Sequence, residues 1–331
     1  MSVDVLAALP RLARRLGGKS AVLAAAERLS GGASMETWAF AVETPGHRRE
    51  LILRRRSAPF DPGASRSTTL AAEAALIEAV RAKGAPAPPL AHLCDEADGL
   101  GEAHVTERIA GETLGRRIVF DSRFEAVRPK LARQCGEILA MIHDTPPPPQ
   151  AQLKIADFAA ELGRYEEVYR ASGAERPVLE LAFQHLKKAA PEPAPPVLLH
   201  GDFRNGNLMI DAKQGVAAVL DWELSHIGDP AEDLSWLCVN SWRFGRPDRP
   251  VGGFGDYADL LAGYEAAGGK PVSLGRVRTW QALGSLKWGV MCLMMYQSWA
   301  GGLEASVERP MIGRRVSETE IDLVQLLEQG L

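Results

Sequence analysis

The chain has 331 residues, of which 46% are hydrophobic and 24% charged, so it can bury a sizeable core without disulfides or a structural metal. Its 38 basic and 42 acidic residues give a net charge of -4, which argues against a strongly basic nucleic-acid-binding protein. Four scattered cysteines without a CxxC pair argue against a disulfide framework or a thiolate zinc site and favour a reducing, cytoplasmic setting.

The first third of the chain predicts strands with one prominent helix. Residues 1–20 lack the apolar core of a signal peptide, and we expect a peripheral amphipathic helix there. Helical spacing of apolar residues predicts a strong helix over 68–83, and the run 21–29 a further helix. Turn signals and β-forming residues predict strands at 37–44, 50–55, 90–94 and 103–107.

After residue 110 the pattern becomes mostly helical. Helices are predicted over 121–143, 157–171, 177–190, 273–300 and 317–327. The longest apolar stretch, around 288–299, is too short to span a bilayer, so we expect no membrane association. The change of pattern predicts a boundary between 1–110 and 111–331.

The stretch 197–236 carries the chemistry. Two short apolar runs, 208–210 and 216–220, predict a hairpin, with Asn207 just before it and Asp221 just after it. The hairpin would bring these two side chains together, with Asp202 five residues upstream of Asn207. Two carboxylates and an amide oxygen form a hard donor set that suits Mg²⁺ better than zinc.

The same stretch resembles the protein-kinase-like superfamily, and specifically the aminoglycoside phosphotransferase (APH) family. His200-Gly201-Asp202 with Asn207 looks like that family's HGDxxxxN loop. Asp221-Trp222-Glu223 takes the place of the metal-binding DFG of protein kinases. Together with Gly228-Asp229-Pro230, it is most similar to the branch that is fused to acyl-CoA dehydrogenases.

The resemblance implies an α+β, bilobal protein-kinase-like fold. An N-terminal lobe of residues 1–110, with an antiparallel sheet and one main helix, would clamp the nucleotide. A mostly helical C-terminal lobe of residues 111–331 would hold the catalytic and substrate-binding residues.

The resemblance also implies roles for single residues. Asp202 would orient the substrate hydroxyl and accept its proton, while Asn207 and Asp221 would hold Mg²⁺ bridging the phosphates of ATP. Glu223 would reach a second metal through water or serve a structural role. Arg204 would contact a phosphate or the substrate, or be an ordinary exposed loop arginine.

Three further residues are expected to support the catalytic loop. His200 would hold it by packing and hydrogen bonding, and Asp233 would brace it from behind. Asp229 is well placed to cap the helix that begins at Pro230.

The nucleotide clamp is expected in the strand-rich part. Gly31, Gly32 and Ser34 stand where a glycine-rich phosphate loop belongs, although a lone Gly pair is also an ordinary turn. Residues 51–54 resemble the strand that carries the phosphate-binding lysine, with Arg54 as the cation. In-out alternation places Arg54 and Arg56 on one face of the strand and Arg55 on the other, and of these residues we favour Arg54.

Two more elements complete the expected ATP site. Glu73 is the expected ion-pair partner of Arg54, with Glu78 as the alternative. The segment 105–111 resembles the linker between the lobes, where the backbone at Glu107 and Ile109 would hydrogen-bond the adenine edge.

The acceptor is expected to be a small hydroxylated molecule. Residues 241–331 contain ten acidic and ten basic residues, so the carboxylate surplus that suits polycationic aminoglycosides is lacking. We therefore favour an anionic alcohol or a hydroxyacyl compound, handled by a monomer or homodimer. The alternatives are an antibiotic kinase, a nucleotide-binding pseudokinase, and a metal-dependent phosphohydrolase that uses His200, Asp202, Asp221, His226 and Asp229.

Overall fold

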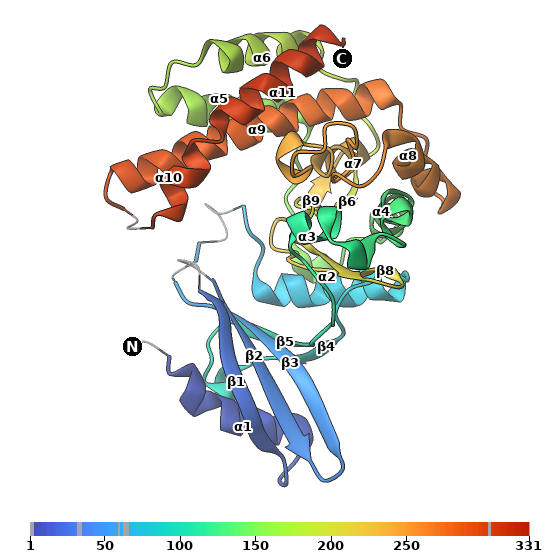
Figure 1. The fold of residues 1–331 in the computed structure, drawn as a ribbon. Coiled ribbons are helices and arrows are strands. Elements are labelled where there is room, and N and C mark those ends of the chain that lie inside the picture. Colours follow the sequence, from blue (N-terminus) through green and yellow to red (C-terminus); the bar gives the residue numbers. More distant parts are fainter. Residues whose placement is uncertain (1–2, 32–34, 59, 62–65, 304–305, 331) are drawn as a thin grey trace.

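The computed structural model describes residues 3–31, 35–58, 60–61, 66–303 and 306–330, arranged in two lobes (Figure 1). The smaller lobe is built on an antiparallel sheet with the strand order β1-β2-β3-β5-β4. Its strands are β1 (Val22–Gly31), β2 (Met35–Thr44), β3 (His47–Arg56), β4 (Leu90–Leu93) and β5 (Ala103–Glu107). This is the predicted α+β fold.

Two helices accompany the sheet. Helix α1 (Val5–Gly17) packs Leu9 and Leu12 against the sheet residues Leu51 and Leu53. Helix α2 (Leu70–Ala82) instead buries its apolar side in the core of the larger lobe, so it lies between the two lobes (Figure 1). Successive side chains of β3 point to opposite faces of the sheet, and Leu51, Leu53 and Arg55 are buried on one of these faces.

The helix predicted over 21–29 is wrong, because these residues belong to β1. The strand pairs with β2 from Val22 opposite Glu43 to Gly31 opposite Glu36. The Ala-rich composition favours a helix locally, but intrinsic propensity is weak and the ladder with β2 overrides it.

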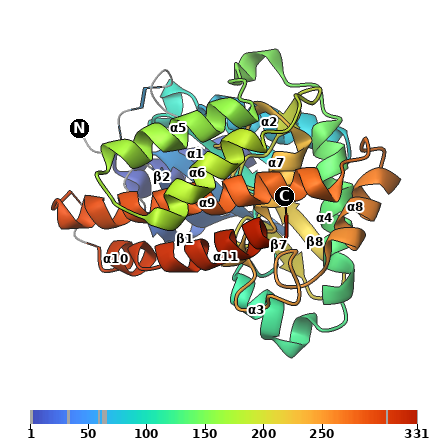
Figure 2. The ribbon, with the colours of Figure 1, turned by 90° about the horizontal axis from the view of Figure 1, so that it is seen from above.

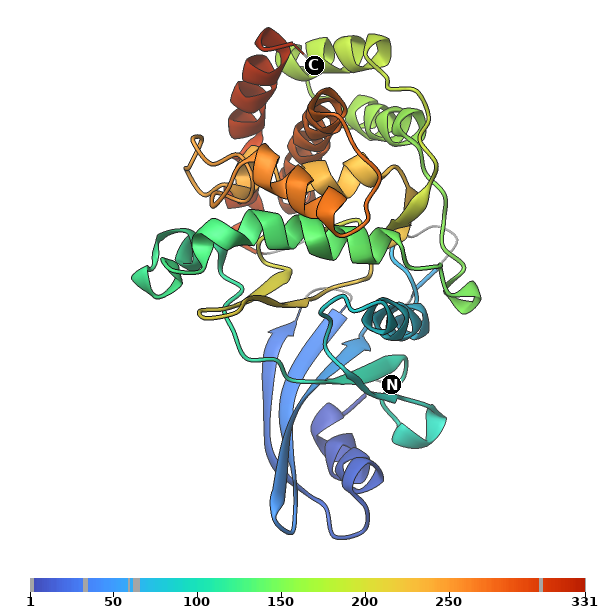
Figure 3. The same cartoon turned by 90° about the vertical axis from the view of Figure 1, so that its right-hand side faces the viewer.

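The larger lobe is mostly helical, with two small two-stranded antiparallel sheets, β6–β9 and β7–β8, of which the β7–β8 hairpin lies toward the smaller lobe (Figure 3). Its strands are β6 (Val197–Leu199), β7 (Leu208–Asp211), β8 (Gly215–Val219) and β9 (His226–Gly228). Its helices are α3 (Gly115–Phe120), α4 (Arg128–His143), α5 (Phe158–Ala171), α6 (Pro177–Lys188), α7 (Pro230–Trp236), α8 (Tyr257–Ala266), α9 (Leu274–Ala300), α10 (Glu308–Gly313) and α11 (Val316–Glu328).

Helix α9 is the long central element of this lobe (Figure 2). Ser273 caps it, accepting a hydrogen bond from Arg276 N, and its first two-thirds are buried among the other helices. The helix predicted over 121–143 begins only at Arg128, and α8, α10 and β9 were not predicted.

The segment after β5 connects the lobes, and we keep residue 110 as the proposed division between them. Among the described residues, no helix has both the length and the apolar character needed to cross a membrane.

Candidate active site

The loop that follows β6 is fixed from behind by a buried carboxylate of α7. Asp233 Oδ2 accepts a hydrogen bond from His200 N at 2.7 Å, and Oδ1 accepts one from Gly201 N at 2.9 Å. Burial alone would raise the pKa of Asp233, but hydrogen bonds from the His143 ring and the loop backbone lower it. Asp233 is therefore a charged brace, as predicted.

The His200 ring ties the same loop to the end of β8. Its Nδ1 accepts a hydrogen bond from Asp202 N at 3.1 Å, so Nε2 carries the proton that is donated to Leu220 O at 3.0 Å. Both ring nitrogens are used within the fold, which confirms the predicted holding role.

Three donors hold the Asp202 side chain. Oδ1 accepts hydrogen bonds from Arg204 Nε at 2.9 Å and from Trp236 Nε1 at 2.6 Å. Oδ2 accepts one from Asn207 Nδ2 at 2.7 Å. Because a carboxylate offers about four acceptor positions, the remaining one lies on Oδ2.

Trp236 is a residue of the site that the sequence analysis missed. It stands on α7, whose N-terminus is capped by Asp229 as predicted. The cap gave a local signal for the helix, but nothing in the spacing showed that its last residue reaches back to Asp202.

The predicted hairpin brings Asn207 and Asp221 together. Leu208 pairs with Val219, and Leu220 N donates a hydrogen bond to Asn207 O at 2.8 Å. The Asn207 amide nitrogen is committed to Asp202, which leaves its Oδ1 for another ligand. Asp221 has φ +65°, a left-handed conformation that is uncommon outside glycine and is often found at functional sites.

Arg54 reaches from β3 across the cleft and contacts three carboxylates. Its Nη2 lies 2.6 Å from Asp221 Oδ1 and 2.7 Å from Glu223 Oε2, and its Nε lies 3.3 Å from Glu73 Oε2. The expected pair with Glu73 is therefore present, whereas Glu78 is exposed.

The two neighbouring arginines point elsewhere. Arg55 pairs with Glu36 at 2.7 Å, and Arg56 pairs with Glu102 at 2.8 Å. Only Arg54 of the three joins the carboxylates around Asp221.

The charge around Arg54 fits a divalent cation. Three carboxylates share one guanidinium, and burial together with the neighbouring Asp221 raises the pKa of Glu223 to about 7 although Arg54 opposes this. Asn207, Asp221 and Glu223 all offer oxygen atoms, the donors that Mg²⁺ prefers. The donor set is thus hard and has surplus negative charge.

A cleft of about 810 Å³ lies between the lobes, and Arg54, Glu73 and Asp221 form part of its lining. Its apolar lining residues include Leu29, Ile52, Ile77, Pro88, Met209 and Leu220. The connecting segment, including Glu107 and Ile109, forms another part of its wall. In the part of the chain that the structure describes, no residue accepts a hydrogen bond from Ile109 N, and the Glu107 side chain is held by Arg49.

Asp202 itself is not a lining residue of the cleft but lies behind Asn207, to which it is hydrogen-bonded. Gly31 ends β1 opposite Glu36. The expected phosphate contacts Gly32 and Ser34 lie outside the described residues.

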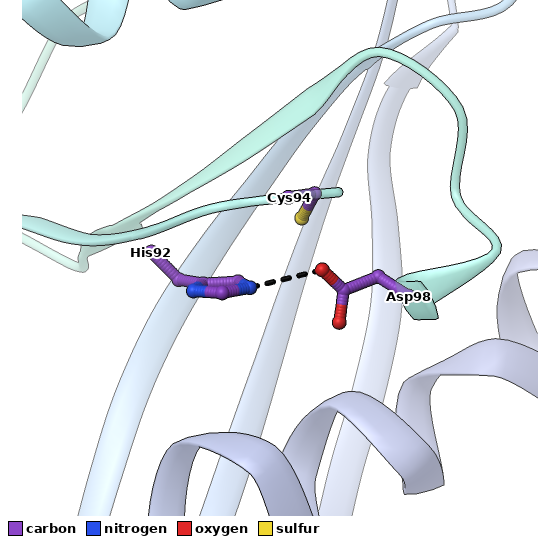
Figure 4. Close-up of side chains that lie close together, drawn as sticks. All are labelled: His92, Cys94 and Asp98. Atoms are coloured by element: carbon purple, nitrogen blue, oxygen red, sulfur yellow. Dashed lines mark hydrogen bonds and ion pairs between the residues drawn. The ribbon is translucent and has the colours of Figure 1, made fainter. Parts of the chain in front are cut away.

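A separate group of potential metal ligands lies in the smaller lobe. Ligand atoms of His92, Cys94 and Asp98 fall within 4.8 Å of one another (Figure 4). The Asp98 carboxylate already lies 2.9 Å from His92 Nε2 and 3.0 Å from Arg15 Nη1. Burial, with a further contribution from Asp98, raises the pKa of Cys94 to about 12. We interpret the group as a structural contact that fastens α1 to the β4–β5 connection.

The phosphohydrolase alternative needs free histidines near Asp202, and the described residues do not supply them. His226 Nδ1 lies 2.9 Å from Leu224 O, and Nε2 lies 3.1 Å from a Glu232 oxygen. His200 is likewise fully used, so neither ring can ligate a metal beside Asp221.

A model of the phosphotransferase enzyme family (APH) matches residues 25–269, which include Arg54, the loop that follows β6 and the β7–β8 hairpin. The chain belongs to this family. Membership in this family makes it a phosphotransferase.

Two mouse proteins are relatives of this phosphotransferase. Acyl-CoA dehydrogenase family member 10 is 26% identical over 202 residues, which cover 58% of this chain and 18% of that protein. Acyl-CoA dehydrogenase family member 11 is 29% identical over 164 residues, which cover 46% of this chain and 20% of that protein. The matched part thus spans about a fifth of the length of these relatives.

Solved structures share the fold of this phosphotransferase. A protein from Ralstonia eutropha JMP134, provisionally assigned as an aminoglycoside phosphotransferase, has a TM-score of 0.76 at 21% identity, with 99% of each chain covered. Spectinomycin phosphotransferase APH(9)-Ia, solved with ADP and spectinomycin, has a TM-score of 0.62 at 14% identity, with 96% of this chain and 98% of that chain covered. These likenesses show the bilobal kinase-like fold.

Proposed function

We propose that this phosphotransferase transfers the γ-phosphate of ATP to a hydroxyl group of a small anionic metabolite, with Asp202 as the catalytic base. The proposal rests on the hydrogen bonding of the Asp202 carboxylate. Three donors fix its orientation, and the one remaining acceptor position lies on Oδ2, beside Asn207.

In the proposed step, the acceptor hydroxyl oxygen forms a bond to the γ-phosphorus while the bond from that phosphorus to the departing ADP oxygen breaks. Asp202 Oδ2 orients the hydroxyl and takes its proton. Arg204 and Trp236 hold Oδ1, so the carboxylate cannot rotate away from the acceptor. Arg204 also places a positive charge beside Oδ1, the oxygen that does not take the proton.

Asn207, Asp221 and Glu223 are the residues that we propose to hold Mg²⁺. When bound, the ion neutralises charge on the phosphates of ATP. Arg54, held by Glu73, is the proposed phosphate-binding cation of the N-terminal lobe. A guanidinium there can bind two phosphate oxygens at once, where a lysine would act as a point charge.

The nucleotide base is proposed to lie in the cleft between the lobes. The apolar residues above and below it would sandwich the adenine, while the backbone at Glu107 and Ile109 would bind its edge. Gly31, at the end of β1, and Gly32 and Ser34, which follow it in the sequence, are the proposed phosphate contacts.

The acceptor class is proposed from charge and from the relatives. The even count of acidic and basic residues after residue 240 disfavours a polycationic antibiotic. The relatives named for acyl-CoA dehydrogenases favour a hydroxyacyl compound, free or as a thioester.

Replacing the proposed base tests this function. Asp202→Ala should lower phosphoryl transfer by about 10²–10⁴-fold, because the proton acceptor is lost, while ATP affinity stays nearly unchanged. Transfer is measured by the formation of phosphorylated product across a panel of alcohols, and ATP affinity by titration. Asp248→Ala, at an exposed position, is the control.

Full activity of the Asp202→Ala variant would contradict the assignment. ATP binding by the unaltered protein without transfer to any alcohol would instead support the pseudokinase alternative.

A further inference from the structure

A nearly buried lysine, Lys287, contacts the Trp236 ring, and this ring is hydrogen-bonded to the proposed base Asp202. Lys287 stands on α9, which packs beside α7 (Figures 1 and 2), and only 8% of its side chain is exposed. Its Nζ lies 4.6 Å from the centre of the Trp236 ring, and Trp236 Nε1 is hydrogen-bonded to Asp202 Oδ1. The indole therefore separates a cation from the catalytic carboxylate.

The Lys287 ammonium is poorly supplied with hydrogen-bond acceptors. Its nearest carboxylate oxygen, Glu232 Oε1, is 3.7 Å away, beyond hydrogen-bonding distance. The other oxygen of Glu232 lies 3.1 Å from the His226 ring. Among the described residues, none accepts a hydrogen bond from Nζ, so its three donors are available to another partner.

A second cation flanks the same place. Arg66, which comes from the segment between β3 and α2, lies 3.0 Å from Glu161 and donates a hydrogen bond to the Tyr165 hydroxyl at 3.0 Å. The Tyr165 ring also lies 5.8 Å from Lys287 Nζ. Lys287, Arg66 and His226 thus lie beside two carboxylates, Glu161 and Glu232, so acidic side chains do not outnumber basic ones at this place.

Two aromatic rings beside a cation with unused donors are groups of the kind that can bind an anion. The rings exclude water and can pack against a short carbon chain, and the ammonium supplies charge-assisted hydrogen bonds. A neutral or cationic group in the same place would leave the ammonium without partners.

We propose that Lys287 is a specificity-determining residue that binds an anionic oxygen group of the acceptor, a carboxylate or a phosphate, while the acceptor hydroxyl lies at Asp202. This inference rests on the proposed function and names its substrate class, a short hydroxylated anion. The hydroxyl and the anionic group would be separated by about the width of the Trp236 side chain.

Steady-state kinetics with matched acceptors test the proposal. The probes are hydroxycarboxylates with the hydroxyl at increasing distance from the carboxylate, each paired with its neutral primary amide. Glycerol 3-phosphate paired with glycerol, and the CoA thioesters of the same hydroxy acids, separate a carboxylate from a phosphate as the anion. Variants are Lys287→Met, Lys287→Arg and the control Lys270→Met, at an exposed position.

The unaltered protein should prefer anionic acceptors over their neutral partners. Lys287→Met should raise KM for the anionic acceptors about ten- to hundredfold, with less change in kcat, no change in KM for ATP and little change for neutral acceptors. Lys287→Arg should recover part of the loss, and Lys270→Met should have no effect. A merely structural lysine would alter all acceptors and the KM for ATP together.

Two failures are distinguishable. Transfer to no alcohol at all would overturn the proposed function and this inference with it. Transfer that is equally good to neutral and anionic acceptors, or that Lys287→Met weakens equally for both, would overturn the inference alone.

Discussion

At the scale of single residues, Arg54 joins the two halves of the site. It belongs to the sheet of the smaller lobe, yet two of its three carboxylate partners, Asp221 and Glu223, belong to the larger lobe. Its third partner, Glu73, is buried and holds the guanidinium in place. We therefore expect a substitution of Arg54 to affect nucleotide binding directly.

Replacing Arg54 with alanine is expected to raise the KM for ATP about ten- to hundredfold, because charge-assisted hydrogen bonds to phosphate are lost. Arg54→Lys should lose less, because it keeps the charge but not the fork of donors. The nucleotide KM is measured on variants whose melting temperatures are also recorded, with the exposed Arg48→Ala as control. An unchanged KM for ATP would show that another cation binds the phosphates.

The residues that could be predicted from the sequence are those whose spacing is local. Asp202, Asn207 and Asp221 lie within one short stretch, and a tight hairpin leaves little freedom in how they meet. Trp236 and Lys287 could not be predicted, because they reach the site from separate helices whose packing no local pattern specifies. The Arg54–Glu73 pair was accessible only through the family resemblance.

At the scale of elements, the sequence predicted the β2–β3 hairpin, α2 and α9 well, since each has strong periodicity and clear end signals. It failed for β1, where a helix-forming composition yields to pairing with β2. A strand's stability resides largely in its neighbours, so composition within the strand is a poor guide.

Helix packing offers a test with a matched pair of glycines. A Cβ at Gly136 of α4 would collide with the backbone of Leu260 and Tyr264 in α8, whereas a Cβ at Gly163 of α5 meets nothing within 4 Å. Gly136→Ala should therefore lower the free energy of unfolding by about 1–3 kcal/mol through overpacking. Gly163→Ala should raise it by up to about 1 kcal/mol, because alanine favours the helix.

Denaturant unfolding of both variants measures the difference. A Gly136→Ala protein as stable as the unaltered one would mean that α4 and α8 pack less closely than the structure shows.

At the scale of the whole molecule, polar contacts hold the two lobes across the cleft. Besides Arg54, Thr68 N donates a hydrogen bond to Glu223 O at 2.7 Å, and Arg66 reaches Glu161 of α5. A nucleotide that contacts both lobes should add to these bridges and stabilise the molecule as a unit.

Addition of ATP with Mg²⁺ is therefore expected to raise the free energy of unfolding by about 2.7 kcal/mol when the nucleotide is at a hundred times its Kd. Chelating the metal, or the substitution Asp221→Asn, should remove most of this gain, because a proposed metal ligand or the metal itself is lost. Thermal unfolding with and without ligand measures the effect, and Asp211→Asn in the hairpin turn is the control. A gain that survives chelation would contradict the proposed metal site.

The cleft between the lobes is lined by residues that run from Leu29 to Trp222, whereas Lys287 and Trp236 follow later in the chain. The residues proposed to bind the nucleotide and those proposed to bind the acceptor thus lie in largely separate stretches of the chain. Mutations in the later stretch could change which alcohol is phosphorylated while ATP handling is inherited intact. Such a division would let acceptor preference be altered by substitutions in the later stretch without changing the residues that line the cleft.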